Sequence, residues 1–239
     1  MSDKTVLILQ HVPNENAGTI LDYLKSRSIP HRAIPLYEKD AVLPELNSVG
    51  AVIVMGGPMN VYEEDKHPFL KREDAFIKKV IQQRIPYLGV CLGAQLLAKA
   101  MGARVYKAVT PEVGWGDVTL TPQAVKDEIF SQVQSKKLRV LQWHEDTFDL
   151  PKGAVLLASS KEVPHQAYCC DELFYGFQFH VEANRPMLED WFKNRSDLDD
   201  ILIEFDGYSK KLTQITDRIY SSFFTRLTEL VKAPVNRVE

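Results

Sequence analysis

Residues 87–95 read YLGVCLGAQ, a stretch in which a strand pattern changes to a helix pattern with no loop between them. The apolar strand ends directly before Cys91, and a helix-forming run over about 92–101 follows at once. Joining the two forces a sharp turn at Cys91. Gly89 and Gly93 flank that turn, where backbone crowding is greatest and a Cβ atom would clash. The stretch therefore predicts a strand–turn–helix elbow of a parallel α/β sheet.

A cysteine at such a turn is well placed to act as a nucleophile. Strained turns of this kind push a side chain out of the sheet surface. The unpaired N–H groups and the dipole at the start of the helix favour the thiolate form. The plainer interpretation of Cys91 is a small buried residue between strand and helix. The glycines on both sides favour the nucleophile.

The pattern on both sides of the elbow indicates the fold class. Short apolar strands alternate with helical patterns in the first half, which predicts parallel β-α-β units covered on both faces. From about 103 to 179 the strands are shorter and separated by turn residues, which predicts antiparallel strands added to one side of the sheet. The expected strands are 5–10, 30–36, 51–55, 87–90, 104–106, 117–120, 138–141 and 174–179, and the expected helices are 17–26, 69–83 and 92–101.

The chain after His180 becomes helical again and carries one apolar stripe. Its members recur three or four residues apart, as on one face of a helix. The stripe is interpreted as core packing or as a homodimer contact, and it consists of Leu212, Ile215, Ile219, Phe223, Leu227 and Leu230. With no repeat and no Gly/Ser linker, we expect a single domain.

Composition narrows the class of protein. The 239 residues carry a net charge of -3 without a basic run, so nucleic acid is not expected as a partner. No apolar run is long enough for a membrane span, and residues 1–5 lack the features of a secretory signal. The three cysteines suit reduced thiols rather than disulfides. We therefore expect a cytoplasmic protein, with no metal site and no cofactor.

A nucleophilic cysteine commonly needs an imidazole as its base, and His180 is the leading candidate. It follows the strand expected at 174–179, and α/β sheets place their chemistry at the carboxyl ends of strands. In an extended chain Glu182 lies on the same face and orients the imidazole. His11 and His144 remain rival bases.

A glycine-rich turn upstream supplies a candidate oxyanion site. Gly56-Gly57-Pro58 follows the strand expected at 51–55, and a glycine there lets backbone N–H groups approach a substrate closely. The amides of Gly57 and Leu92 are the expected donors. The alternatives are a phosphate loop, although the glycine-lysine spacing of such a loop is missing, and a plain tight turn.

These residues together resemble the class I glutamine amidotransferase family. The resemblance covers roughly residues 5–190 and is carried by the sequences GVCLGAQ at 89–95, HVE at 180–182 and GGP at 56–58. Residues 57–64 and 142–148 are similar to the amidotransferase domain of GMP synthase in particular. The likeness implies a flavodoxin-like sheet, with the family domain over 1–190 and a helical extension over 191–239 packed on it.

The family resemblance also implies a mechanism and a substrate. It implies a triad of Cys91, His180 and Glu182 that forms a γ-glutamyl thioester and releases ammonia from glutamine. Gly56, Gln95 and the segment Trp143, His144 and Glu145 are then expected to hold the substrate. Glu145 stands where relatives often carry glycine, which narrows the site or changes its charge. Ala94 stands where many relatives have a larger residue.

Three functions stay open at this point. The chain has no room for the ATP-pyrophosphatase domain of GMP synthase, so we expect either a separate synthase subunit that receives ammonia or hydrolysis without transfer. The second function is a γ-glutamyl peptidase acting on glutathione-like or γ-glutamylated compounds. The third is a catalytically silent relative that binds a small molecule or a partner.

Overall fold

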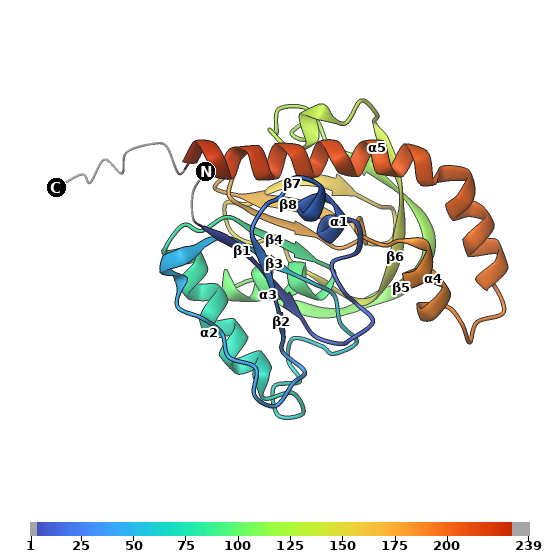
Figure 1. Ribbon diagram of the computed structural model, residues 1–239. Helices are drawn as coiled ribbons and strands as arrows, with labels where there is room; N and C mark the ends of the chain where they lie inside the picture. The colour runs from blue at the N-terminus through green and yellow to red at the C-terminus, as the bar shows by residue number, and fades with distance from the viewer. Residues whose placement is uncertain (1–3, 231–239) are drawn as a thin grey trace.

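A nine-stranded mixed sheet runs through the computed structural model of the protein, which describes residues 4–230 and the side chains up to residue 225 (Figure 1). The strands lie in the order β2-β1-β3-β4-β9-β8-β7-β5-β6. They are β1 (Thr5–Gln10), β2 (His31–Pro35), β3 (Val49–Val54), β4 (Tyr87–Val90), β5 (Val105–Leu120), β6 (Lys137–Phe148), β7 (Val155–Ser159), β8 (Ala167–Cys170) and β9 (Phe174–Phe177).

The parallel half of this sheet confirms the predicted β-α-β units. Strands β2, β1, β3, β4 and β9 are all paired in parallel. The helices are α1 (Gly18–Ser26), α2 (Phe69–Gln82), α3 (Leu92–Ala100), α4 (Arg185–Trp191) and α5 (Leu198–Leu230), with short 3-10 turns η1 (Leu46–Ser48) and η2 (Phe130–Gln132). The strands and helices predicted in the first half begin and end within two residues of these bounds.

Two apolar layers cover the faces of the sheet, because alternate residues of a strand point to opposite sides. In β1, Val6 and Ile8 pack in a cluster that includes residues of α1 and α5. Leu7 and Leu9 pack in a second cluster that includes residues of α2 and α3. The result is a three-layer α/β/α arrangement, with α1 and α5 on one face and α2 and α3 on the other.

The antiparallel half differs from the prediction in the length of its strands. Residues 104–106 and 117–120 were expected as separate strands, but β5 is one strand of 16 residues. Its pairing with β6 continues past Pro111 after an irregularity between Lys107 and Glu112, and past Gly114 with its positive φ of 93°. A bulge thus absorbs residues that resemble a turn in the sequence. The predicted strand at 138–141 is likewise only the first part of β6.

Helix α5 resolves the two interpretations of the apolar stripe. Leu212, Ile219 and Phe223 are buried, and Ile215 is half-buried against the same cluster as β1. The stripe is therefore core packing as far as the structure describes it, and the interpretation as a dimer contact is wrong for these residues. The side chains of the two remaining members, at 227 and 230, lie outside the described residues.

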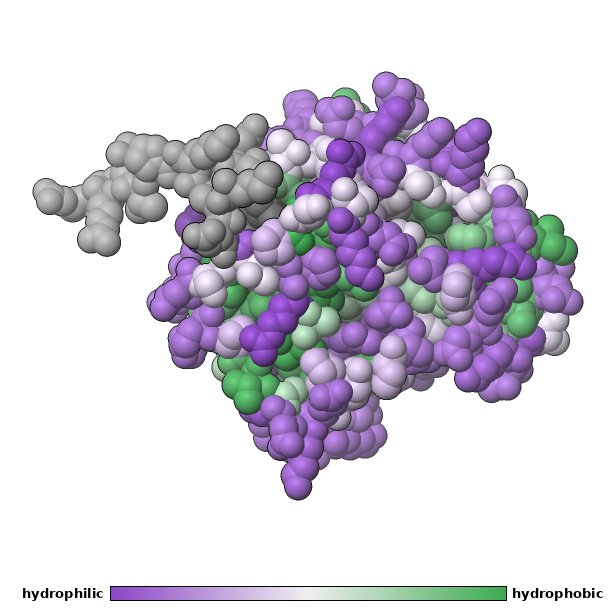
Figure 2. Space-filling model, viewed as in Figure 1, coloured by the Kyte–Doolittle hydropathy of each residue, from purple (hydrophilic) through white to green (hydrophobic). Residues whose placement is uncertain are grey.

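The visible surface is mostly hydrophilic. Figure 2 shows polar residues over most of this face, with apolar residues in small groups between them. Within residues 4–230, no helix has both the length and the apolar character needed to cross a membrane.

Candidate active site

The elbow between β4 and α3 has the strained geometry that its glycines predict. Cys91 adopts φ 50° and ψ -105°, a left-handed conformation that costs a non-glycine residue about 1–3 kcal/mol. Its N–H extends the β4–β9 ladder by donating to the Phe177 carbonyl at 2.7 Å. A Cβ at Gly89 would collide with the backbone of Gly93, and one at Gly93 would collide with the carbonyl of Val54. The close contact of helix and sheet thus requires both glycines.

His180 approaches Cys91 from the segment that follows the neighbouring strand β9. That strand ends at Phe177, two residues earlier than predicted, and the His180 N–H then pairs with the Leu141 carbonyl of β6 at 2.9 Å. The ring lies beside Cys91, since Cε1 of His180 and Cβ of Cys91 lie 3.1 Å and 3.7 Å from the place that a Cβ on Gly56 would take. Its Nδ1 lies 2.8 Å from Oε1 of Glu182. Because Glu182 occupies Nδ1, Nε2 is the nitrogen left for the thiol and the substrate.

The charge state of His180 follows from these two neighbours. Burial by itself lowers the pKa of His180, but attraction to Glu182, the hydrogen bond with Glu182 and the interaction with Cys91 outweigh it and raise the pKa well above the usual value. His180 and Glu182 are only 2% and 1% exposed, so water screens the pair weakly. The arrangement therefore favours an imidazolium beside the cysteine sulfur.

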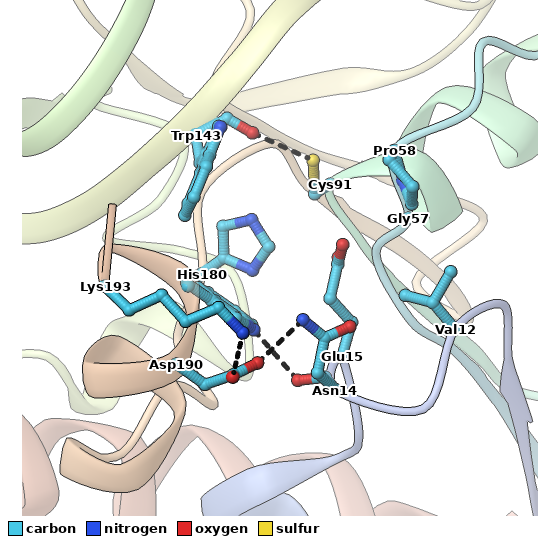
Figure 3. Close-up of a pocket in the computed structure, with 11 residues that line it drawn as sticks. Val12, Asn14, Glu15, Gly57, Pro58, Cys91, Trp143, His180, Asp190 and Lys193 are labelled. Atoms are coloured by element: carbon cyan, nitrogen blue, oxygen red, sulfur yellow. Dashed lines mark hydrogen bonds and ion pairs between the residues drawn. The ribbon is translucent and has the colours of Figure 1, made fainter. Parts of the chain in front are cut away.

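Two further groups contact the sulfur of Cys91. The thiol lies 3.6 Å from the Trp143 carbonyl, the contact drawn in Figure 3, and the Gln178 side-chain amide donates to the sulfur at 3.8 Å. Gln178 was not predicted. It is held by Gln95, whose amide donates both to the Gln178 side chain and to the Asp146 carbonyl at 3.2 Å. Gln95, which was predicted to contact the substrate, thus holds the side chain that donates to the sulfur.

The rival base His11 has no free nitrogen. Its Nδ1 lies 2.8 Å from the Gly56 carbonyl and its Nε2 lies 3.0 Å from the carboxylate of Glu73, and both side chains are fully buried. Burial lowers the pKa of His11, but attraction and hydrogen bonding to Glu73 raise it more. Because a peptide is planar and trans, fixing the Gly56 carbonyl toward His11 turns the Gly57 N–H away from His11.

The second rival, His144, is also occupied. Its Nδ1 donates to the Asp146 carbonyl at 3.1 Å, and its Nε2 contacts Glu112 and the side chain of Gln142. Successive side chains of β6 point to opposite faces, so His144 is buried while Trp143 and Glu145 are on the exposed side. Glu145 pairs with Lys107 at 3.0 Å.

A cavity of about 330 Å³ opens above Cys91 (Figure 3). Four of the predicted site residues line it: Gly57, Cys91, Trp143 and His180. Gln95, His144 and Glu145 are not among the lining residues, and Gly56 lies beneath it against Cys91 and His180. The lining residues that sequence reasoning missed are Val12, Asn14, Glu15, Pro58, Asp190, Trp191 and Lys193.

Apart from Pro58 in the turn after β3, the missed residues come from the loop after β1 and from the end of α4 and the residues just after it. The Trp191 indole donates to the Asn14 carbonyl at 2.8 Å, and the Asn14 side chain donates to Asp190 at 2.8 Å. Trp191 also lies edge-on to the His180 ring, with centroids 4.9 Å apart. The loop could have been found from the sequence, because it follows the carboxyl end of a parallel strand. The contact with α4 could not, because it joins segments about 175 residues apart.

The other two cysteines lie away from the elbow. Cys169 and Cys170 are free, buried residues of β8, as predicted. Burial raises the pKa of each thiol to about 12, so neither is a thiolate at neutral pH.

Comparison with known proteins agrees with this geometry. The family model of class-I glutamine amidotransferases matches residues 14–194, and the chain belongs to that family. A solved structure of a glutamine amidotransferase from Thermotoga maritima superposes with a TM-score of 0.86 at 29% identity, covering 96% of this chain and all of that one. The single-domain fold is therefore that of stand-alone class I glutamine amidotransferases.

Three curated proteins with different names are similar to this chain in sequence. The glutamine amidotransferase-like protein YfeJ of Salmonella typhimurium is 30% identical over 182 residues, covering 75% of this chain and 76% of YfeJ. GMP synthase of Wolinella succinogenes is 30% identical over 187 residues, which is 77% of this chain but only 34% of the synthase. Gamma-glutamyl peptidase 4 of Arabidopsis thaliana is 32% identical over 157 residues, covering 63% of this chain and 62% of the peptidase. The chain thus spans about a third of the length of the GMP synthases that it matches.

Proposed function

We propose that this protein hydrolyses the γ-amide of glutamine through a γ-glutamyl thioester on Cys91. The observation that carries the proposal is the buried group of Cys91, His180 and Glu182, in which the imidazole lines the same cavity as the thiol and its Nδ1 lies 2.8 Å from the carboxylate. This is the arrangement of nucleophile, base and orienting acid that amide hydrolysis needs.

The reaction proceeds in two halves. The Cys91 thiolate attacks the γ-carbonyl carbon, and the amides of Gly57 and Leu92 donate to the oxyanion that forms. Leu92 begins α3, so its N–H has no partner within the helix, and the Gly57 N–H is turned away from His11. The carbon–nitrogen bond then breaks as the His180 imidazolium protonates the leaving nitrogen. In the second half, His180 takes a proton from water, the water attacks the thioester, and glutamate leaves with the thiol restored.

The remaining substrate contacts stay predictions. The backbone of Trp143 to Glu145 adjoins the sulfur and is proposed to hold the α-amino and α-carboxylate groups, with Gln95 fixing that strand to α3. A separate synthase subunit is proposed to receive the ammonia, as the similarity to GMP synthases suggests. The free thiols suit a reducing compartment such as the cytoplasm.

A second candidate function is cleavage of γ-glutamyl compounds with larger leaving groups. The chemistry is the same, and only the space beyond the scissile nitrogen differs. The cavity favours this candidate because it continues past His180 to Asp190 and Lys193 at the end of α4. The similarity to a gamma-glutamyl peptidase supports it as well.

Steady-state release of glutamate and ammonia by the purified protein tests the first proposal. We expect turnover of glutamine by the wild-type protein and by Cys170→Ala, which changes a cysteine outside the site, and no turnover by Cys91→Ala with folding intact. A glutamine-mimicking diazo ketone should add to Cys91. Turnover that survives in Cys91→Ala would contradict the mechanism, and a wild-type protein that forms no adduct and hydrolyses no γ-glutamyl compound would be a catalytically silent binding protein.

A further inference from the structure

An acidic side chain that the proposed mechanism does not use points into the cavity. Glu15 lies in the loop between β1 and α1, and Figure 3 shows its carboxyl group directed toward Cys91. Three atoms surround the place that a Cβ on Gly56 would take: Oε2 of Glu15 at 2.5 Å, Cε1 of His180 at 3.1 Å and Cβ of Cys91 at 3.7 Å. The carboxyl group therefore reaches the reacting centre itself, in space that the glycine leaves free.

Within the described part of the chain, the Glu15 side chain has no hydrogen-bond or ion-pair partner. By contrast, the buried acids Glu73 and Glu182 each contact a histidine within about 3 Å. Glu15 is half-buried, and partial burial raises the pKa of its carboxyl group, with the nearby charge of Glu182 adding to the rise and those of His180 and His11 opposing it. A carboxylate that faces a cavity without a protein donor is free to accept a hydrogen bond from a ligand bound there.

The position of Glu15 beside His180 places it on the side of the leaving group. The imidazolium must lie next to the scissile nitrogen to protonate it, so groups that border His180 in the cavity face the departing amine. The other charged groups there are Asp190 and Lys193, which pair with each other at 2.9 Å. Because Asp190 and Lys193 neutralise each other, Glu15 is the charged group in this part of the cavity that has no ion-pair partner.

We propose that Glu15 makes the site selective for γ-glutamyl compounds whose leaving group is a cationic amine, such as γ-glutamylated diamines. This inference rests on the proposed γ-glutamyl hydrolysis. An ammonium group a few bonds beyond the scissile nitrogen meets the Glu15 carboxylate, which supplies the missing ion pair. A leaving amino acid instead carries its α-carboxylate two bonds from that nitrogen, where it meets a like charge. The bond that breaks and the products are otherwise unchanged: glutamate and the free amine.

Three matched probes test the selectivity. They are mono-γ-glutamyl 1,4-diaminobutane, which carries an ammonium, γ-glutamylbutylamide, which is neutral, and γ-glutamylglycine, which carries a carboxylate. We expect kcat/KM of the wild-type protein, measured by glutamate release, to fall in that order, with about tenfold or more between the first and the last, the effect of about 1.4 kcal/mol of charge interaction. Glu15→Gln should bring the three values together. Asp22→Asn removes the same charge from an exposed site on α1 and should keep the wild-type order.

The outcomes separate this inference from the proposed function. Equal values for the three probes in the wild-type protein, a preference for γ-glutamylglycine, or an order unchanged in Glu15→Gln would overturn the role of Glu15 while leaving γ-glutamyl hydrolysis intact. Absence of glutamate release from all three probes and from glutamine would instead overturn the proposed function. The comparison within the wild-type protein stands even if Glu15→Gln does not fold.

Discussion

Replacing Glu182 with glutamine tests the electrostatic core of the site. The substitution keeps the shape of the side chain but removes the charge that lies 2.8 Å from Nδ1 of His180. The imidazolium then loses the partner that stabilises it and holds Nε2 toward Cys91. Both side chains are nearly inaccessible to water, so solvent does not replace the lost interaction.

The size of the effect follows from the type of contact. A hydrogen bond to a charged group contributes about 1.5–3 kcal/mol. A change of about 1.36 kcal/mol corresponds to a factor of ten, so kcat/KM for glutamine should fall about 10- to 150-fold. In the proposed cycle the imidazolium protonates the leaving nitrogen and forms again when His180 takes a proton from water. We therefore expect kcat to fall as well as kcat/KM.

The substitution should change the pH profile of kcat/KM and the pH dependence of stability, each in one direction. Glu182 raises the pKa of His180, so the substitution lowers it and moves the alkaline limb of the kcat/KM profile to lower pH. A raised histidine pKa stabilises the folded state fully below the unfolded pKa of about 6.5, and this contribution disappears as the pH rises through the folded pKa. The variant should therefore lose more free energy of unfolding at mildly acidic pH than at alkaline pH.

The assays are a pH series of glutamine turnover and urea unfolding at one acidic and one alkaline pH. Glu204→Gln is the matched control, since it neutralises a glutamate that pairs with Arg139 at a half-exposed site. The reasoning is refuted if Glu182→Gln keeps the wild-type alkaline limb, or if Glu204→Gln moves it as far.

Three more outcomes can be measured on single samples. Gly93→Ala places a methyl group against the Val54 carbonyl and should lower the free energy of unfolding by about 1–3 kcal/mol in a urea titration, and unchanged stability would refute the tight elbow. His11→Asn frees the peptide that orients the Gly57 N–H and should lower kcat about tenfold or more with little change in KM, whereas a rise in KM alone would show a binding role. Brief treatment of the native protein with iodoacetamide should add one group, at Cys91, because burial raises the pKa of the other two thiols to about 12; two or three adducts by mass spectrometry would contradict this.

Local patterns in the sequence determined much of the fold and the centre of the site. The run at 87–95 predicts the elbow because steric crowding there leaves few residues other than glycine at positions 89 and 93. The pair His180 and Glu182 was likewise predicted from a two-residue spacing in an extended segment, and the two side chains do meet. These predictions depend only on neighbours in the chain, which is why a single sequence is enough for them.

Only the tertiary structure decided which distant groups share the cavity. Glu15 and Gln178 reach Cys91 because separate strands of a parallel sheet end at the same edge, and no spacing in the sequence encodes that distance. The strand β6 turns His144 inward, although its sequence neighbours suggested a substrate contact. The length of β5 depended on pairing with β6 across an irregularity that resembles a turn. Side-chain direction and strand length are set by long-range packing and pairing, which a local pattern of residues does not contain.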